Sequence, residues 1–282
     1  MQECTIELSG PPQPVRLHYT RWGPADAERT IMCVHGLTRQ GRDFDVLAAA
    51  LAEGGAQVLC PDMVGRGKSD WLNDPAGYLA PVYIAHVQEM LAKLGIGRVD
   101  WVGTSMGGLI GMGLAAMPDG PIRRLVLNDI GPFIPAESLA YIAEYVIRAP
   151  RFANLAEAEA YLREIHRGFR DLSDQDWVAA TVHGTRPAEG GGVTLAHDPA
   201  IGAVFTQDAM VDVDIWPVYD GLTNPTLLLR GADSLLLTAE VADAMTRRGP
   251  RAELITFAGV GHAPGLVAPE QVAAVKAFLE AG

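Results

Sequence analysis

The sequence predicts an α/β protein built on a mostly parallel sheet. Three observations indicate this class: short apolar runs recur along the chain, stretches with helical spacing of apolar residues separate them, and an alternating hairpin-like segment precedes them. Strands buried on both faces read as continuous apolar runs, which is typical of parallel sheets covered by helices. The alternation of strand and helix therefore predicts the α/β class.

The first element is a hairpin. Residues 5–8 and 15–19 alternate apolar and polar side chains, and the turn-forming segment Ser9–Pro12 lies between them. Alternation with period two is typical of a strand with one solvated face. We therefore expect an antiparallel pair at one edge of the sheet.

The elements of the parallel part follow in order along the chain. Compact apolar runs predict further strands at residues 30–34, 57–60, 99–102, 125–127, 226–229 and 253–256. Apolar residues at helical spacing predict helices at residues 43–52, 82–94, 109–117, 239–247 and 270–279.

One long segment interrupts this alternation. Residues 132–216 contain helical stretches with scattered aromatic residues and the break Gly190–Gly192, and no strand is expected in them. We interpret them as a helical cap inserted between two strands of the sheet. The core of the protein then consists of residues 1–131 and 217–282.

Composition limits the classes of partner. The 282 residues are 49% hydrophobic, which is enough for a large core, and the formal net charge is −12. A phosphate backbone or an anionic membrane surface attracts Lys and Arg, and no stripe of basic residues is present. We therefore expect a small-molecule partner and neither nucleic acid nor membrane.

The N-terminal segment and the cysteines indicate a cytoplasmic protein. The first ten residues lack a basic region followed by an apolar one, and the apolar runs are shorter than the ~20 residues of a membrane span. Cys4, Cys33 and Cys60 lie far apart without CxxC spacing. We expect Cys33 and Cys60 to be core thiols.

A nucleophile motif follows the third expected parallel strand. Residues 99–102 lead into Gly103-Thr104-Ser105-Met106-Gly107 and then an apolar helix, which is the strand, G-x-S-x-G, helix order of a nucleophile elbow. Ser105 is the expected nucleophile. Because the helix begins with free N–H groups and a positive dipole end, the Met106 N–H is an expected oxyanion donor. A phosphate-binding loop would require Lys with Ser or Thr after its last glycine, or G-x-G-x-x-G, and neither is present.

The second oxyanion donor is expected after the first parallel strand. Residues 31–34 are followed by His35, Gly36 and Leu37, and a glycine allows the tight turn that would aim the Leu37 N–H at Ser105. We expect His35 to fix this loop by hydrogen bonds rather than to act as the catalytic base.

His262 is the expected general base. It follows the last strand, residues 253–256, in a glycine-rich loop, and a serine hydroxyl needs an imidazole to take its proton. The other histidines lie in the hairpin, in a helix or in the cap: His18, His86, His166, His183 and His197.

Two aspartates compete for the role of the acid that orients this base. Asp233 follows the strand at residues 226–229, as the chain order Ser, Asp, His requires. Asp129 ends the strand that precedes the cap, at the sheet edge where functional side chains gather. We prefer Asp233 and keep Asp129 as the alternative.

Several motifs together resemble the α/β-hydrolase superfamily, over nearly the whole chain. The resemblance is closest to its small capped branch of carboxylesterases, lactonases and carbon–carbon bond hydrolases. The motifs are His35–Leu37, Asp62–Asp70, Gly103–Gly108, Leu127–Pro132 and Gly259–His262.

The resemblance implies an eight-stranded, mostly parallel sheet, a helical lid after the sixth strand, and no cofactor. Two departures matter. Members of this branch often place an aspartate where Leu235 stands, whereas here the nearest carboxylate is Asp233, two residues earlier. Dehalogenases and epoxide hydrolases place Asp at the elbow, so Ser105 argues against both.

The expected reaction is hydrolysis of an ester or lactone through an acyl-enzyme on Ser105. In the cap, Arg186 is a candidate for binding a substrate carboxylate and Trp177 for lining an apolar pocket. Two alternatives stay open: a carbon–carbon bond hydrolase of a diketone using the same residues, and a non-catalytic binding protein on the same fold. Either a monomer or a homodimer is compatible with the sequence.

Overall fold

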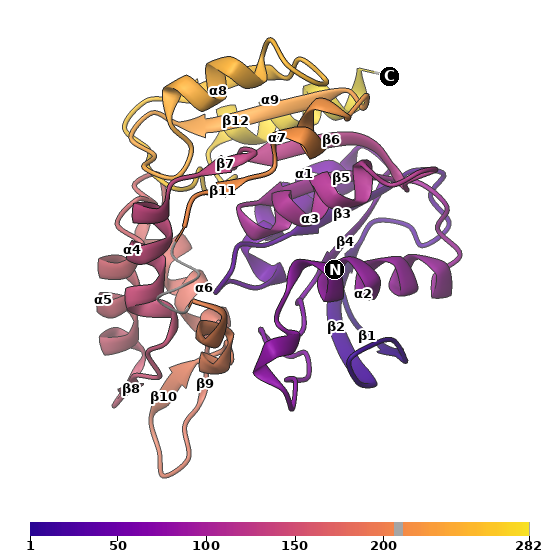
Figure 1. The fold of residues 1–282 in the computed structure, drawn as a ribbon. Coiled ribbons are helices and arrows are strands. Elements are labelled where there is room, and N and C mark those ends of the chain that lie inside the picture. The colour runs from indigo at the N-terminus through magenta and orange to yellow at the C-terminus, as the bar shows by residue number, and fades with distance from the viewer. Residues whose placement is uncertain (206–210, 282) are drawn as a thin grey trace.

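The computed structural model describes residues 1–205 and 211–281 and centres on an eight-stranded sheet (Figure 1). The strands lie in the order β1 (Gln2–Leu8), β2 (Val15–Trp22), β4 (Gln57–Pro61), β3 (Thr30–Val34), β5 (Val99–Thr104), β6 (Ile122–Asn128), β12 (Thr226–Gly231), β13 (Glu253–Phe257). β1 pairs antiparallel with β2 and β2 with β4, whereas all later pairs are parallel. The α/β class and the edge hairpin are confirmed.

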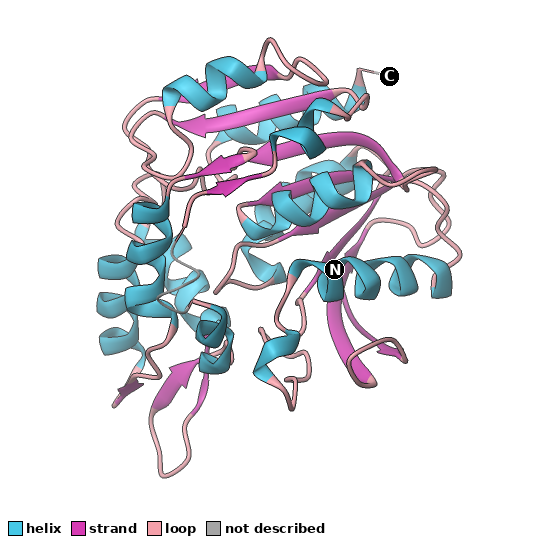
Figure 2. Ribbon diagram, viewed as in Figure 1, coloured by secondary structure: helices cyan, strands magenta, loops and turns pink. Residues whose placement is uncertain are grey.

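Helices cover both faces of this sheet (Figure 2). Residues of α1 (Asp45–Glu53) and α9 (Pro269–Glu280) form one core cluster, and residues of α2 (Ala80–Lys93), α3 (Met106–Ala115) and α8 (Ala239–Met245) form the other. Strand β3 contributes to both clusters, with Met32 and Val34 on one face and Ile31 and Cys33 on the other. This is why its sequence is apolar throughout. Cys33 and Cys60 are buried, as expected.

Residues 132–216, the segment expected to be a cap and called the cap segment below, lie between β6 and β12 in the chain, and their described part projects from the end of the sheet (Figure 1). Its elements are β7 (Phe133–Ile134), α4 (Ala136–Val146), β8 (Arg151–Phe152), α5 (Leu155–Ile165), α6 (Asp174–Gly184), β9 (Thr185–Pro187), β10 (Val193–Leu195), the 3₁₀-helix η3 (Pro199–Val204) and β11 (Val213–Asp214).

The expectation that this segment contains no strand is wrong. β8, β10 and β9 form a three-stranded sheet, and β11 pairs with β7. Strands of two or three residues are too short to show a periodic pattern in the sequence. The expected boundary between residues 216 and 217 also falls inside a helix, α7 (Trp216–Asp220).

The carboxyl ends of the parallel strands meet at the sheet edge that faces the cap segment (Figure 1). Loops after β3, β5, β6, β12 and β13 therefore converge there, although they are far apart in the sequence. Within the described part of the chain, no helix is long and apolar enough to cross a membrane.

Candidate active site

Ser105 lies at the sharp turn between β5 and α3. Its backbone has φ +51°, in the left-handed region, and its N–H donates to the Asn128 carbonyl at 3.1 Å. The turn packs too tightly for side chains: a Cβ on Gly107 would lie 2.0 Å from the Val34 carbonyl oxygen, and one on Gly103 would lie 2.3 Å from that of Gly107. The chain is therefore held so that the Ser105 side chain stands out at the sheet edge.

His262 joins Ser105 to Asp129 in one line of polar contacts. Its Nε2 lies 3.1 Å from Ser105 Oγ, and its Nδ1 lies 2.7 Å from Asp129 Oδ2. An ionised carboxylate only accepts, so we assign the imidazole proton to Nδ1, which leaves Nε2 free to accept from the serine hydroxyl. This is the geometry that prepares a serine for nucleophilic attack.

Asp129 is fully buried and held by two further donors. The Gly231 N–H donates to its Oδ1 at 2.8 Å, and the Ser234 hydroxyl donates to its Oδ2 at 2.5 Å. Hydrogen bonds to the charged form stabilise a buried carboxylate. The carboxylate is thus fixed directly after β6, and the Oδ2 that accepts from Ser234 also faces His262 Nδ1.

The preference for Asp233 is corrected by this geometry. The Asp233 side chain is 47% exposed, and its Oδ2 pairs with Arg170 Nη1 at 2.9 Å. Its own N–H bonds to the Val260 carbonyl, which anchors the loop after β12 with the carboxylate turned outward. The strand order does not distinguish the two, because β12, which precedes Asp233, lies between β6 and the β13 that precedes His262.

The loop after β3 lies against Ser105. A Cβ on Gly36 would approach Ser105 Cβ to 3.7 Å, and Leu37 lines the same space. His35 fixes this loop: its Nε2 accepts from the Met63 N–H at 2.9 Å, so its Nδ1 donates to the Gly36 carbonyl at 2.7 Å. Burial lowers the pKa of His35 to about 4, so the ring is neutral. Leu37 and Met106 remain the expected oxyanion donors on either side of Ser105.

Arg66 was not anticipated from the sequence. Its fully buried guanidinium donates to the Leu37 carbonyl through Nε and to Tyr83 Oη through Nη1, both at 2.8 Å, and its Nη2 approaches Met106 Sδ at 3.4 Å. In the described residues no carboxylate lies within ion-pair distance of it. The sequence feature that could have indicated a buried Arg66 is the pair of flanking glycines, Gly65 and Gly67. Both have positive φ, which lets the chain bend sharply and point the arginine side chain inward.

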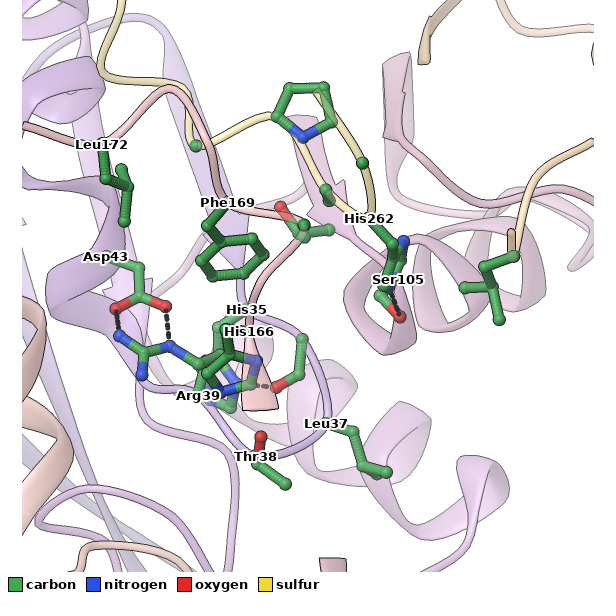
Figure 3. A pocket seen from close by; sticks show the side chains of 18 of the residues that line it. His35, Leu37, Thr38, Arg39, Asp43, Ser105, His166, Phe169, Leu172 and His262 are labelled. Carbon is green, nitrogen blue, oxygen red and sulfur yellow. Dashed lines mark hydrogen bonds and ion pairs between the residues drawn. The ribbon is translucent and has the colours of Figure 1, made fainter. Parts of the chain in front are cut away.

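A cavity of about 650 Å³ adjoins Ser105 and His262, between the sheet edge and the cap segment (Figure 3). Several apolar and aromatic side chains line it from the cap segment, among them Tyr141, Ile142, Tyr145, Ile165, Phe169 and Leu172. Arg39 and His166 add polar groups. Across residues 1–205 and 211–281, no three His, Cys, Asp or Glu side chains are grouped so that they could hold a metal ion.

The two cap residues expected to bind substrate do not line this cavity. Trp177 is buried in the core of the cap segment beside Phe169, with ring centroids 6.3 Å apart. Arg186, on β9, stacks over the Trp71 ring at 4.3 Å. Both assignments are corrected. Trp177 packs with other aromatic side chains inside the cap segment, and Arg186 stacks against the loop after β4.

Comparisons with known proteins give consistent matches over most of the chain. The model of the alpha/beta hydrolase fold family matches residues 29–269. A 3-hydroxybutyrate-oligomer hydrolase of Cupriavidus necator is 39% identical over 274 residues, covering 93% of this chain and 92% of that protein. A 2-(acetamidomethylene)succinate hydrolase of Mesorhizobium japonicum is 27% identical and covers 88% and 86%. The crystal structure of an alpha/beta hydrolase from Novosphingobium aromaticivorans has a TM-score of 0.87 and 35% identity, covering 99% and 98%.

Proposed function

The chain belongs to the α/β-hydrolase fold family, and from this premise we propose that it is a serine hydrolase that cleaves esters of short hydroxyacyl chains. The observation that carries the proposal is the line from Ser105 Oγ through His262 to the buried Asp129, with separations of 3.1 and 2.7 Å. In this arrangement Ser105 is the nucleophile, His262 the base and Asp129 the acid.

The reaction follows from these positions. His262 Nε2 takes the proton of Ser105 as the oxygen attacks the ester carbonyl, and Asp129 stabilises the imidazolium that forms. The N–H groups of Leu37 and Met106 stabilise the oxyanion. His262 then gives its proton to the leaving alcohol, and in the second half it activates the water that releases the acid.

The cap segment supplies the other side of the binding site. We assign residues 132–216 as the cap and residues 1–131 and 217–282 as the catalytic core. The cavity between them is large enough for a short acyl chain, and the apolar side chains that line it from the cap segment suit aliphatic carbon. The name of the 39% identical relative supports an oligomer of 3-hydroxybutyrate as the substrate class.

The test compares wild type with Ser105→Ala on p-nitrophenyl butyrate and on a linear 3-hydroxybutyrate trimer, with released acid measured by chromatography. We expect wild type to cleave both and Ser105→Ala to lose at least 10³-fold in kcat, with an unchanged circular dichroism spectrum. Ser105→Ala activity above a few per cent of wild type would refute the nucleophile.

Labelling with a fluorophosphonate tests whether Ser105 is a reactive nucleophile, independently of which ester is the substrate. A wild-type protein that is labelled at Ser105 but cleaves neither ester would have a working nucleophile and a different substrate. A vinylogous diketone is then the substrate to assay, because a carbon–carbon bond hydrolase would use the same three residues.

A further inference from the structure

Two polar side chains of the cavity have hydrogen-bonding capacity that the protein does not use. The first is Arg39, in the loop after β3 (Figure 3). Its Nε and Nη2 donate to the two carboxylate oxygens of Asp43, both at 2.7 Å, and only 6% of the residue is exposed. Its Nη1 donates to no described residue. One arm of a buried guanidinium therefore carries two free N–H groups.

The second is His166, at the C-terminal end of α5. Its ring stacks on Phe169 with centroids 5.1 Å apart, and Tyr145 meets it edge-on at 5.8 Å. The residue is 8% exposed, and its ring nitrogens bond to no described residue. Burial, reinforced by the nearby positive charge of Arg39, lowers its pKa well below the ordinary value, so the ring is neutral. A neutral imidazole offers one donor and one acceptor.

These two groups share the cavity with the nucleophile. His166 is two residues before Gly168, whose carbonyl accepts from the Gly261 N–H at 2.9 Å, next to His262. Gly168 and Gly261 approach so closely that a Cβ on Gly261 would lie 2.8 Å from Gly168 Cα. The end of α5 is therefore fixed against the loop of the catalytic base, and Arg39 lies close enough to His166 for its charge to lower the pKa of the ring.

We propose that Arg39 and His166 form a subsite for an uncharged hydroxyl group on the acyl chain of the substrate. A hydroxyl accepts from the free Nη1 of Arg39 and donates to the unprotonated nitrogen of His166, which gives each side chain one partner. This inference rests on the proposed ester hydrolase function and deepens it, because it makes the enzyme select hydroxyacyl over plain acyl esters.

The charges of the cavity disfavour a carboxylate at this position. Asp43 already neutralises Arg39, so a second carboxylate would be buried there without a cation of its own. Among the other cations that line the cavity, Arg42 pairs with Asp45 and Arg170 with Asp233. Arg167 is exposed and lies over the Tyr141 ring, where a charged group would stay in contact with water.

The experiment measures kcat/KM for three esters: p-nitrophenyl butyrate, p-nitrophenyl 3-hydroxybutyrate and mono-p-nitrophenyl succinate. His166→Phe keeps an aromatic ring for Phe169 and Tyr145 but removes both polar atoms. His183→Phe, in α6 and outside the cavity lining, is the matched control. His166→Gln retains one donor and one acceptor.

We expect wild type to prefer the 3-hydroxybutyrate ester over the butyrate ester by about tenfold, the effect of one well-formed hydrogen bond. His166→Phe should lose this preference, so that its kcat/KM values for the 3-hydroxybutyrate and butyrate esters become nearly equal. His183→Phe should keep the preference, and His166→Gln should keep part of it.

Other outcomes overturn the subsite in distinguishable ways. If wild type and His166→Phe have the same ratio while both hydrolyse butyrate, the hydroxyl subsite is wrong and the ester hydrolase stands. If His166→Phe loses mainly the succinate ester, the occupant is a carboxylate. If wild type hydrolyses none of the three, the proposed function fails and the subsite with it.

Discussion

Two residues of the proposed catalytic line, Ser105 and Asp129, have left-handed backbones, with φ values of +51° and +56°. For a residue with a side chain this conformation costs of the order of 1–3 kcal/mol and persists only where the surroundings enforce it. Hydrogen bonds hold Asp129 in this conformation. Its N–H donates to the Leu229 carbonyl, and its carboxylate accepts from the Gly231 N–H and the Ser234 hydroxyl. Such strain is typical of functional positions.

A comparison of Asp129→Asn with Asp233→Asn tests which carboxylate orients His262. In Asp129→Asn the amide no longer fixes the proton on Nδ1, and we expect kcat for p-nitrophenyl butyrate to fall by about 10³- to 10⁴-fold. Asp233→Asn loses an exposed ion pair and should stay within about twofold. The reverse order of effects would contradict the assignment of Asp129.

Two aspartates were candidates for the acid in the sequence, because each follows an expected strand: Asp129 follows residues 125–127 and Asp233 follows residues 226–229. The expected place of the acid, after the strand at residues 226–229, favoured Asp233, whereas in the structure Asp129 contacts His262. The choice depends on which loop bends inward, and that is decided by backbone bonds such as Asp233 N–H to the Val260 carbonyl, which leave no local pattern. Ser105 and His262, which the structure places 3.1 Å apart, could be proposed from the sequence because glycines at fixed spacing mark both loops.

Arg66 is a positioning residue that ties the loop carrying Leu37 to the start of α3. In Arg66→Met the Leu37 carbonyl loses its donor, and we expect kcat to fall by about 10- to 100-fold with KM changed by less than threefold. Arg66→Lys keeps the charge but cannot reach all partners, so it should be intermediate.

Binding of a boronic acid, which forms a tetrahedral anion on the serine, provides the second readout for Arg66. We expect its affinity to fall in parallel with kcat, because both depend on the oxyanion donors. A raised KM with unchanged kcat would show that Arg66 acts on substrate binding instead.

At the scale of elements, the turn from β5 to α3 requires residues without side chains at Gly103 and Gly107. Gly107→Ala would put a Cβ 2.0 Å from the Val34 carbonyl oxygen, so the first turn of α3 must move away from β3. We expect a loss of about 3 kcal/mol, measured as a fall in Tm of roughly 5–10 °C by differential scanning calorimetry.

Gly97→Ala is the matched control for this turn. A Cβ at Gly97 meets nothing within 4 Å, so the same chemical change should move Tm by no more than about 2 °C. Equal changes in Tm in the two variants would mean that replacing a glycine, and not the contact with Val34, causes the loss of stability.

The elements of the core were predicted well because each one is long enough to show its period. β3, at Thr30–Val34, coincides with the predicted strand, and α2 and α9 differ from their predictions by a few residues at the ends. The cap segment was predicted less well. Its strands have two or three residues, and they are held by tertiary packing around Phe152, Leu162 and Trp177 rather than by any local pattern.

At the scale of the whole molecule, buried neutral histidines such as His35 and His197 couple folding to pH. Burial, together with the positive charge of Arg66, lowers the pKa values of both from the ordinary 6.5 to about 4. Between pH 6.5 and 4 the unfolded chain binds protons at these residues that the folded protein does not bind. The free energy of unfolding therefore falls as pH decreases through this window.

We expect each histidine to remove about 2.5 kcal/mol between pH 7.5 and 4.5, measured by urea unfolding at both values. His35→Asn lacks one titrating group, so it should be less stable than wild type at pH 7.5 but lose less between the two pH values. An equal loss in both proteins would exclude His35 as a source of the pH dependence.

His262 follows Asp129 by 133 positions in the sequence, so the residues of the proposed catalytic line are synthesised at different times. At about 5–20 residues per second, a nascent chain contains Ser105 and Asp129 for roughly 7–27 s before His262 is made. In the part of the sheet that the structure describes, β13 pairs with β12 alone, so it can dock only after residues 132–216 have been synthesised. If Ser105, His262 and Asp129 act together as proposed, a growing chain that lacks β13 holds the serine without its base and does not cleave esters.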